Sequence, residues 1–172
     1  MPRRRKNRSA EPIRSLLRAL DQAFDHHTWH GTNLRGSLRG LTPAQARWRP
    51  APRRHNIWEE VLHAAYWKYA VRQRLTGGKR GGFPHKGANW FPTPSRSLGT
   101  TGAAEWKQAL ALLDELHESL RAAVAQVPVA HLDRAVQGSK WSAFDSILGV
   151  AFHDIYHAGQ IQLLKRLHKA GQ

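Results

Sequence analysis

Two histidines, His153 and His157, stand four residues apart in the segment "AFHDIYHAGQIQLLKRL" near the C-terminal end of the chain. Four residues correspond to about 400° of an α-helix, so both imidazoles would project from one helix face, one turn apart. Such a pair could bind one metal ion, because imidazole nitrogen is a common ligand of zinc and other transition metals. The same spacing recurs at His26 and His30, and 11 histidines in 172 residues give roughly one such pair by chance. The pair alone does not identify a metal site.

The surroundings of the pair leave two interpretations open. At 100° per residue, Ser146, Gly149 and Gln160 fall within about 40° of His153, so small and polar residues share one stripe with the histidines. The rest of this segment is apolar nearly all round, and we expect its helix to be largely buried. The pair could ligate a metal, or each ring could be a core histidine that hydrogen-bonds a neighbouring carbonyl. A third ligand would decide.

Composition limits the setting of such a site. A chain of 172 residues can bury a core without disulfides or metal, so we expect a bound metal to be functional rather than structural. The absence of cysteine excludes thiolate ligands and cysteine nucleophiles, which leaves His, Asp and Glu. No apolar run reaches the roughly 18 residues of a membrane span, and "MPRRRKNR" is not followed by the apolar run of a signal peptide. We therefore expect a cytoplasmic protein without membrane contact.

The formal net charge of +15 would attract nucleic acid through long-range fields and counterion release. Five basic residues lie within the first eight positions, and we expect residues 1–11 to form a disordered basic tail. The sequence has no zinc finger, ribonucleoprotein motif or clear helix-turn-helix. Any contact with nucleic acid is therefore expected to be non-specific.

Helix signals are frequent along the chain and strand signals are scarce. Thr42, Asn56 and Ser142 each precede an apolar pattern as N-cap residues. The predicted helices are residues 12–41 (one helix, or two broken near Gly31), a short helix after Thr42, then 56–76, 102–127 and 142–168. Four long helices without strands predict an all-α four-helix bundle, formed as one domain by residues 12–170. Residues 76–100 are rich in Gly and Pro and form either an ordered lid or a floppy loop.

Two stretches of the sequence carry a family resemblance. "NIWEEVLHAAYWKYAVRQRL", followed some ninety residues later by "FHDIYHAGQIQLLKRL", resembles the DinB/YfiT-like superfamily of proposed metalloenzymes. The pattern of that family is one His on the second bundle helix and H-x-x-x-H-x-G-Q on the fourth. "WHGTNLRGSLRGLTPAQARWRPAP" is also similar to the N-terminal region of the family, so the resemblance covers residues 12–168. It implies a four-helix bundle with a three-histidine divalent metal site, whose ligands here would be His63, His153 and His157.

The residues around His63 support this assignment only in part. His63 shares its helix face with polar residues such as Asn56 and Glu59, so periodicity alone places it at the surface or boundary. If His63 instead points into a cavity between helices, Glu59 or Glu60 could orient its imidazole by hydrogen bonding.

Four further histidines are not expected to bind the metal. His117 falls within the apolar stripe of the helix at 102–127, where the family pattern has no ligand, and we expect a hydrogen-bonded core or cavity histidine. His26, His27 and His30 flank the likely helix break, and an exposed or structural role is expected for them.

Three neutral histidines leave a coordination position for water or substrate, as in catalytic sites. A divalent ion, zinc or nickel first, would activate water or polarise a thiol or carbonyl. Because the resemblance extends to thiol-dependent transferases, we expect a metal-dependent hydrolase or thiol-S-transferase that acts on a small molecule with a low-molecular-weight thiol as cosubstrate. The alternative is a stress-associated binding protein with a basic surface for nucleic acid and a non-catalytic metal. A homodimer is compatible with the bundle, but no sequence feature fixes its interface.

Overall fold

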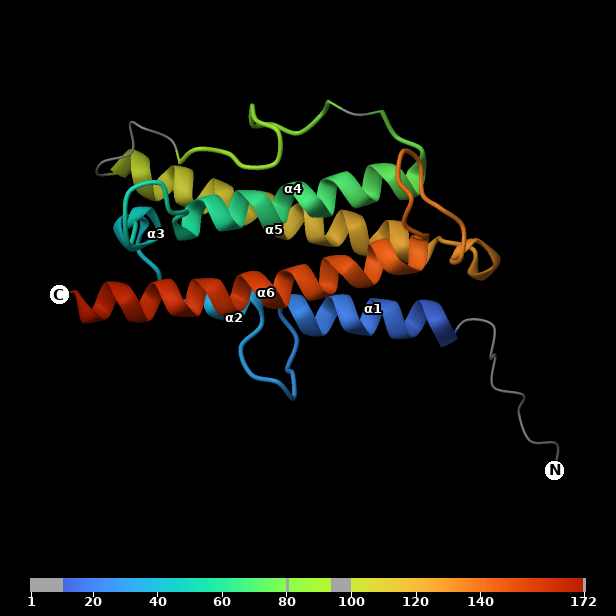
Figure 1. Cartoon of the computed structure of the whole chain (residues 1–172), viewed down its shortest axis with the longest axis horizontal. Coiled ribbons are helices and arrows are strands. Elements are labelled where there is room, and N and C mark those ends of the chain that lie inside the picture. Colours follow the sequence, from blue (N-terminus) through green and yellow to red (C-terminus); the bar gives the residue numbers. More distant parts are fainter. Residues whose placement is uncertain (1–10, 80, 94–99, 172) are drawn as a thin grey trace.

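A computed structural model describes residues 11–79, 81–93 and 100–171 (Figure 1). The described part of the chain is helical and contains no strand, which confirms the predicted all-α class. The predicted basic tail spans residues 1–11. Residues 1–10 lie outside the described part of the chain, and residue 11 is the first residue of the first helix. The helices are α1 (Glu11–Phe24), α2 (Leu34–Ser37), α3 (Pro43–Arg47), α4 (Ile57–Thr76), α5 (Thr100–Ala125) and α6 (Ala143–Ala170), with a 3-10 turn at Val129–His131.

The helices begin and end where local chemistry favours it. The side chain of Asn56 accepts a hydrogen bond from the backbone N–H of Glu59 at 2.9 Å, and the side chain of Glu59 reaches back to the N–H of Asn56, a capping box. Gly77 ends α4 in a left-handed conformation with φ of 68°. The hydroxyl of Ser142 caps α6 by accepting from the N–H of Asp145 at 3.0 Å. These caps fix the two helices that carry the candidate site.

The four long helices α1, α4, α5 and α6 form the bundle, and α6 spans most of its length (Figure 1). The N-terminal segment that could have been one helix is two, because α1 ends at Phe24 and α2 is a single turn capped by Asn33. Both α1 and α2 pack against α6, and α4 packs against both α5 and α6. The packing of α4 against α6 is the contact on which the site depends.

Two apolar clusters fill the interior at opposite ends of α4 and α6. One includes Trp58 and Leu62 of α4 with Ile161 of α6, and the other includes Val71 of α4 with Ile147 of α6. Between them, both helices bury polar side chains. The buried polar or charged side chains of α4 and α6 are Glu59, Glu60, His63, Lys68, Asp154 and His157. A polar layer between two apolar ends needs internal partners, because water does not solvate it freely.

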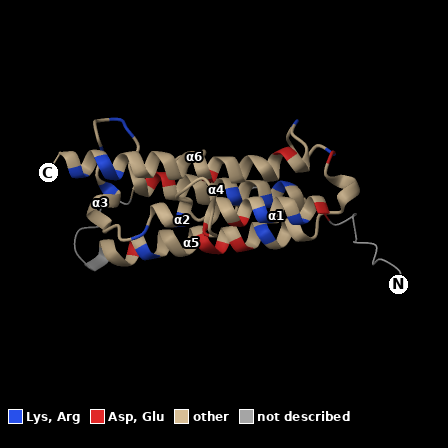
Figure 2. Cartoon of the chain, turned by 90° about the horizontal axis from the view of Figure 1, so that it is seen from below, with Lys and Arg blue, Asp and Glu red and all other residues tan. Residues whose placement is uncertain are grey.

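The expectation that α6 is largely buried is wrong. Phe152, Tyr156 and Leu163 are 65%, 64% and 57% exposed. In Figure 2, α6 lies along one edge of the bundle, and α1, α2 and α4 pack against it. These neighbours cover only part of its circumference, so an apolar face is left uncovered.

The charged residues do not form one large basic face in the view of Figure 2. Lys and Arg are distributed along the helices and loops, with Asp and Glu among them. Among the described residues, no helix combines the length and apolar character that crossing a membrane requires.

Candidate metal centre

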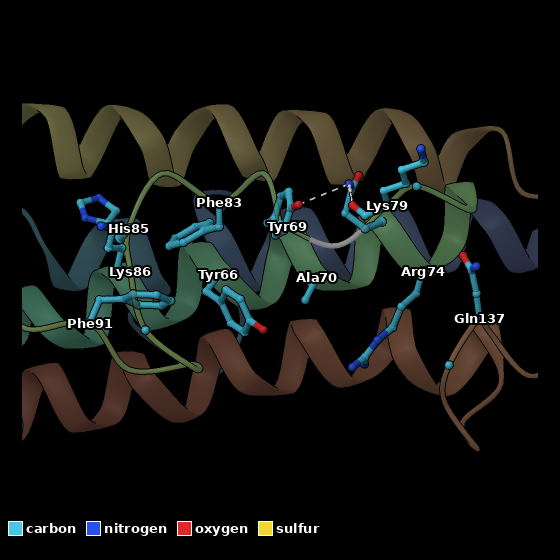
Figure 3. Close-up of a pocket in the computed structure, with 15 residues that line it drawn as sticks. Tyr66, Tyr69, Ala70, Arg74, Lys79, Phe83, His85, Lys86, Phe91 and Gln137 are labelled. Atoms are coloured by element: carbon cyan, nitrogen blue, oxygen red, sulfur yellow. Dashed lines mark hydrogen bonds between the residues drawn. The ribbon is translucent and has the colours of Figure 1, made fainter.

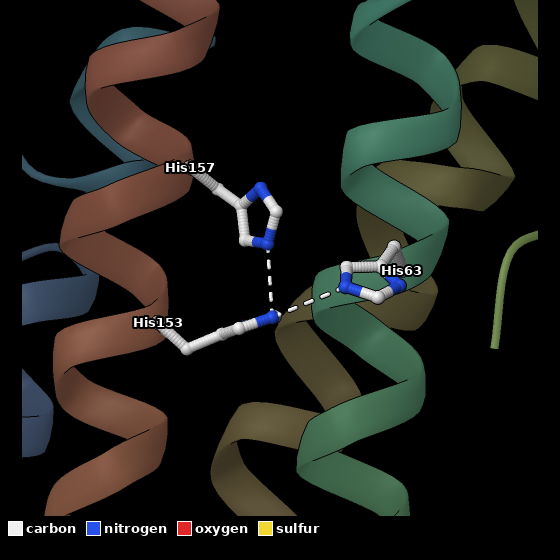
Figure 4. Close-up of side chains that lie close together, drawn as sticks. All are labelled: His63, His153 and His157. Atoms are coloured by element: carbon white, nitrogen blue, oxygen red, sulfur yellow. Dashed lines mark hydrogen bonds between the residues drawn. The ribbon is translucent and has the colours of Figure 1, made fainter. Parts of the chain in front are cut away.

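Three histidines from two helices point toward one another (Figure 4). His63 comes from α4, while His153 and His157 lie one turn apart on α6. Nε2 of His153 is 3.1 Å from Nε2 of His63 and 2.9 Å from Nε2 of His157. One possible ligand atom from each residue lies within 4.8 Å of the others, so the group could hold a metal ion. The three residues that the sequence singles out are thus brought together.

The ring of His63 is oriented by the segment that follows α4. Its Nδ1 lies 2.6 Å from the carbonyl oxygen of Asn89, and its ring stacks on Trp90 with centroids 3.9 Å apart and an interplanar angle of 6°. A carbonyl oxygen only accepts, so Nδ1 carries the proton and Nε2 presents a lone pair. Sequence reasoning missed Asn89 and Trp90, because their segment has no periodicity to place it against α4.

His157 is oriented by a carboxylate of the facing helix. Oε2 of Glu60 on α4 contacts Nδ1 of His157, and both side chains are buried. A carboxylate beside Nδ1 favours the tautomer of His157 that carries its proton on Nδ1, and this tautomer again leaves Nε2 with a lone pair. The sequence suggested that Glu59 or Glu60 would orient His63, but Glu60 contacts His157, and Glu59 pairs with Arg49 at 2.5 and 2.8 Å.

This proton arrangement fits a bound cation. With Nδ1 protonated in His63 and His157, two Nε2 lone pairs face Nε2 of His153. His153 has at most one proton on that nitrogen and can satisfy only one of its neighbours. At least one close approach between nitrogens then lacks a proton, and a cation among the three rings would satisfy all of them. A histidine that ligates a metal through one ring nitrogen typically donates the N–H of its other ring nitrogen to a carbonyl or carboxylate oxygen.

Burial keeps the rings in the form that binds metal. Desolvation, together with the neighbouring imidazoles of His157 and His63, lowers the pKa of His153 to about 3. Desolvation also lowers the pKa of His63, against the hydrogen bond to Asn89 that raises it. These two imidazoles are therefore neutral near pH 7, so a metal ion need not displace a proton from them.

A cavity of about 480 Å³ lies beside His153, between α4 and α6. Its lining is mostly apolar, with one cationic side chain, Arg74, and one acidic side chain, Asp145. The lining residues include Trp67, Val71 and Arg74 of α4, Leu148, Gly149, Phe152 and His153 of α6, and Trp141 before α6. We call this cavity the His153 groove. It gives a small molecule access to one of the three histidines.

A larger pocket of about 900 Å³ lies between α4 and the segment that follows it (Figure 3). Tyr66 and Tyr69 of α4 line it together with Phe83 and Phe91 of that segment, and the ring of Phe83 contacts both tyrosines, with centroids 5.4 and 5.7 Å apart. None of the three clustered histidines lines this pocket. The smaller His153 groove is therefore the cavity that serves the candidate centre.

The described part of residues 77–99 is packed against the bundle. The backbone N–H of Gly82 donates to the hydroxyl of Tyr69 at 2.8 Å, and the amide of Asn56 donates to the hydroxyl of Thr93 at 2.9 Å. Phe91 is buried. Of the two predicted alternatives, these contacts favour an ordered cover over α4 for residues 77–79 and 81–93, while residues 80 and 94–99 lie outside the described part.

The other histidines lie apart from the cluster. His117 is buried in the core, stacked on Phe24 with centroids 3.8 Å apart, and its Nε2 is 3.9 Å from Asp21. His26, His27 and His30 are exposed, as expected. Gln160, on the same stripe as the two α6 histidines, is half-buried, and its Oε1 has no hydrogen-bond partner among the described residues.

Comparison with known proteins agrees with this geometry. The chain matches the family model of the DinB superfamily over residues 26–161, which is most of its length and includes all three clustered histidines. No curated protein matches the chain. No solved structure matches it either.

Proposed function

We propose that this chain, which belongs to the DinB superfamily, is a metal-dependent enzyme in which His63, His153 and His157 hold one divalent ion. The observation that carries the proposal is the convergence of three Nε2 atoms, two of them on rings whose Nδ1 is held by Asn89 and Glu60. Zinc or nickel is the expected ion, since imidazole ligands suit both.

Three protein ligands leave a position for water or substrate, and a divalent ion there lowers the pKa of water or polarises a thiol or carbonyl. We propose hydrolysis, or transfer of a low-molecular-weight thiol to a small molecule. Glu60 and Asn89 keep two imidazoles in the ligating tautomer. Trp90 covers the face of His63 and limits the access of water to that side.

The His153 groove suggests the kind of substrate. Trp67, Leu148 and Phe152 give it an apolar lining. The guanidinium of Arg74 lies 5.7 Å from the ring centroid of Trp67, where it could pair with an anion. We propose a small substrate or cosubstrate that has an apolar part and an anionic group.

Elemental analysis of the purified protein tests the metal. We expect one divalent ion per chain, and His153→Ala should lose it, because two imidazoles do not make a stable site. The matched control is the double variant His26→Ala with His30→Ala, which removes a pair of the same spacing from an exposed position and should keep the ion. Full metal content in His153→Ala would refute the assignment. A screen for hydrolysis and thiol transfer, with and without chelator, then tests the reaction.

A nucleic-acid-binding function is the alternative, and the net charge of +15 favours it. It requires an association with DNA that weakens with salt and is unchanged by His153→Ala. Turnover that depends on metal and is lost in His153→Ala would favour the enzyme instead.

A further inference from the structure

The exposed face of α6 is apolar over most of its length. At 100° per residue, Leu148, Phe152, Tyr156, Gly159 and Leu163 all fall within about 40° of Phe152. Phe152, Tyr156 and Leu163 are each more than half exposed. A solvated helix face normally carries charged residues, and a continuous apolar stripe indicates a surface that is covered by something else.

Charge is confined to the two ends of this helix. Between Asp145 and Lys165, the one Asp, Glu, Lys or Arg of α6 is Asp154, which is completely buried against Lys68. The N-terminal end thus carries an exposed acidic residue, and the C-terminal end carries the basic residues Arg166 and Lys169.

We propose that a second copy of this chain covers the face, with the two α6 helices antiparallel about a two-fold axis between Ile155 and Tyr156. In this arrangement, residues equally far along the chain from that midpoint lie at the same level. The pairs that meet in this way are Ile155 with Tyr156, Phe152 with Gly159, Leu148 with Leu163, Asp145 with Arg166 and Phe144 with Leu167.

The pairs are complementary in size and in charge. The space beyond Gly159 is open, since a Cβ there would meet nothing within 4 Å, so it can receive the ring of Phe152 from the second copy. The acidic end of each α6 meets the basic end of the other, near Asp145 and Arg166. A parallel arrangement would instead place like charges together and stack Phe152 on Phe152. This complementarity selects a second copy over an unrelated partner or a membrane surface.

The proposed dimer also bears on the candidate site. Leu148 and Phe152 belong both to the exposed face and to the lining of the His153 groove. The C-terminal half of α6 from the second copy would therefore form the outer side of each groove. The dimer itself does not depend on the metal.

Sedimentation equilibrium of the full chain tests the proposal. We expect a dimer at micromolar concentration for the wild-type protein. Leu163→Lys should be a monomer, because the dimer interface would then bury two lysines, each against Leu148 of the other copy. Adding Leu148→Glu to Leu163→Lys should restore the dimer, since the two new charges meet at the same level. Trp29→Lys changes an exposed aromatic residue that lies outside α6 and is the matched control. Retained helical circular dichroism and metal content in Leu163→Lys would show that the fold and the proposed function stand apart from the interface.

Cross-linking tests the register, because the chain has no cysteine of its own. With a mild oxidant, Tyr156→Cys should form a disulfide-linked dimer beside the axis. Leu148→Cys and Leu163→Cys should each cross-link poorly alone and well when mixed. A monomeric wild-type protein, a dimer that survives Leu163→Lys, or cross-linking of Leu148→Cys alone would overturn the proposal. Binding of the monomer to vesicles of anionic phospholipid would assign the face to a membrane surface and overturn it as well.

Discussion

Two polar clusters are buried between α4 and α6, and they are built in opposite ways. In one, His63, His153 and His157 bring three like groups together with their lone pairs facing. In the other, Lys68 of α4 forms an ion pair with Asp154 of α6, and both side chains are fully buried. Asp154 directly follows His153, so one helix turn supplies both clusters from different faces.

The difference lies in what each cluster needs to be complete. Lys68 and Asp154 neutralise each other, and Nζ of Lys68 also lies 4.8 Å from the ring centroid of Phe24, which stacks on His117. In that cluster, which we call the ion-pair cluster, the protein supplies both opposite charges, although Oδ1 of Asp154 has no hydrogen-bond partner among the described residues. The histidine cluster has no internal counter-charge among its three rings and borders the His153 groove. The ion-pair cluster should therefore govern folding, and the histidine cluster should govern ligand binding.

Breaking the ion pair should have the largest effect. Lys68→Met leaves Asp154 buried without a counter-charge, and we expect the free energy of unfolding to fall by about 3–5 kcal/mol. Urea denaturation of the metal-free protein measures it. The double variant Lys68→Met with Asp154→Leu is the control, and it should recover most of the loss because no charge is left buried. Equal losses in the single and double variants would mean that the pair matters only through packing.

Removing the metal should cost less and should leave the fold intact. We expect the helical circular dichroism to persist after chelation, because the two apolar clusters contain none of the three histidines. The melting temperature should fall and should recover when metal is added, since free metal at 100 times Kd stabilises the folded state by about 2.7 kcal/mol. Loss of helicity on chelation would show that the histidine cluster also governs folding.

Glu60→Gln should weaken metal binding without removing it. A neutral amide cannot hold the Nδ1 proton of His157 as strongly as a carboxylate, and loss of such a partner typically lowers metal affinity roughly 10–100-fold. Competition with a chelator of known affinity measures the change. Glu59→Gln is the matched control, because the neighbouring carboxylate pairs with Arg49 and His55 and not with the three clustered histidines. Similar affinities in the two variants would contradict the role of Glu60.

The helices and the three clustered histidines could be predicted from the sequence, because caps, periodicity and family motifs are local signals. Asn56 and Ser142 mark the starts of α4 and α6 as predicted. The burial of His63, in contrast, could not be predicted from the pattern of its own helix. Its own helix face is polar, and it is buried because α6 packs against its ring and Asn89 and Trp90 cover it.

The partners of the histidines and the exposure of α6 could not be predicted, for a physical reason. Periodicity reports which face of a helix is apolar, but it does not report which other element meets that face. Glu60 reaches His157 only because of the relative rotation of α4 and α6. The apolar face around Phe152 looked like core because composition cannot distinguish an apolar face that is buried within the chain from one that is left exposed.

Acid should lower the free energy of unfolding through His117, which lies beside the ion-pair cluster. This is the smallest of the four expected effects. Burial, together with the charges of Lys68 and Arg121, lowers the pKa of His117 to about 3. The folded protein thus holds His117 neutral where the unfolded chain, with a pKa near 6.5, binds a proton. The stability that this residue contributes is fully present above about pH 6.5 and is lost progressively as the pH falls toward 3. Between pH 7.5 and 5.5, the free energy of unfolding of the metal-free protein should fall by about 1 kcal/mol more than that of His117→Phe. Urea denaturation at each pH measures both. Parallel pH profiles for the two proteins would mean that His117 does not couple folding to protons.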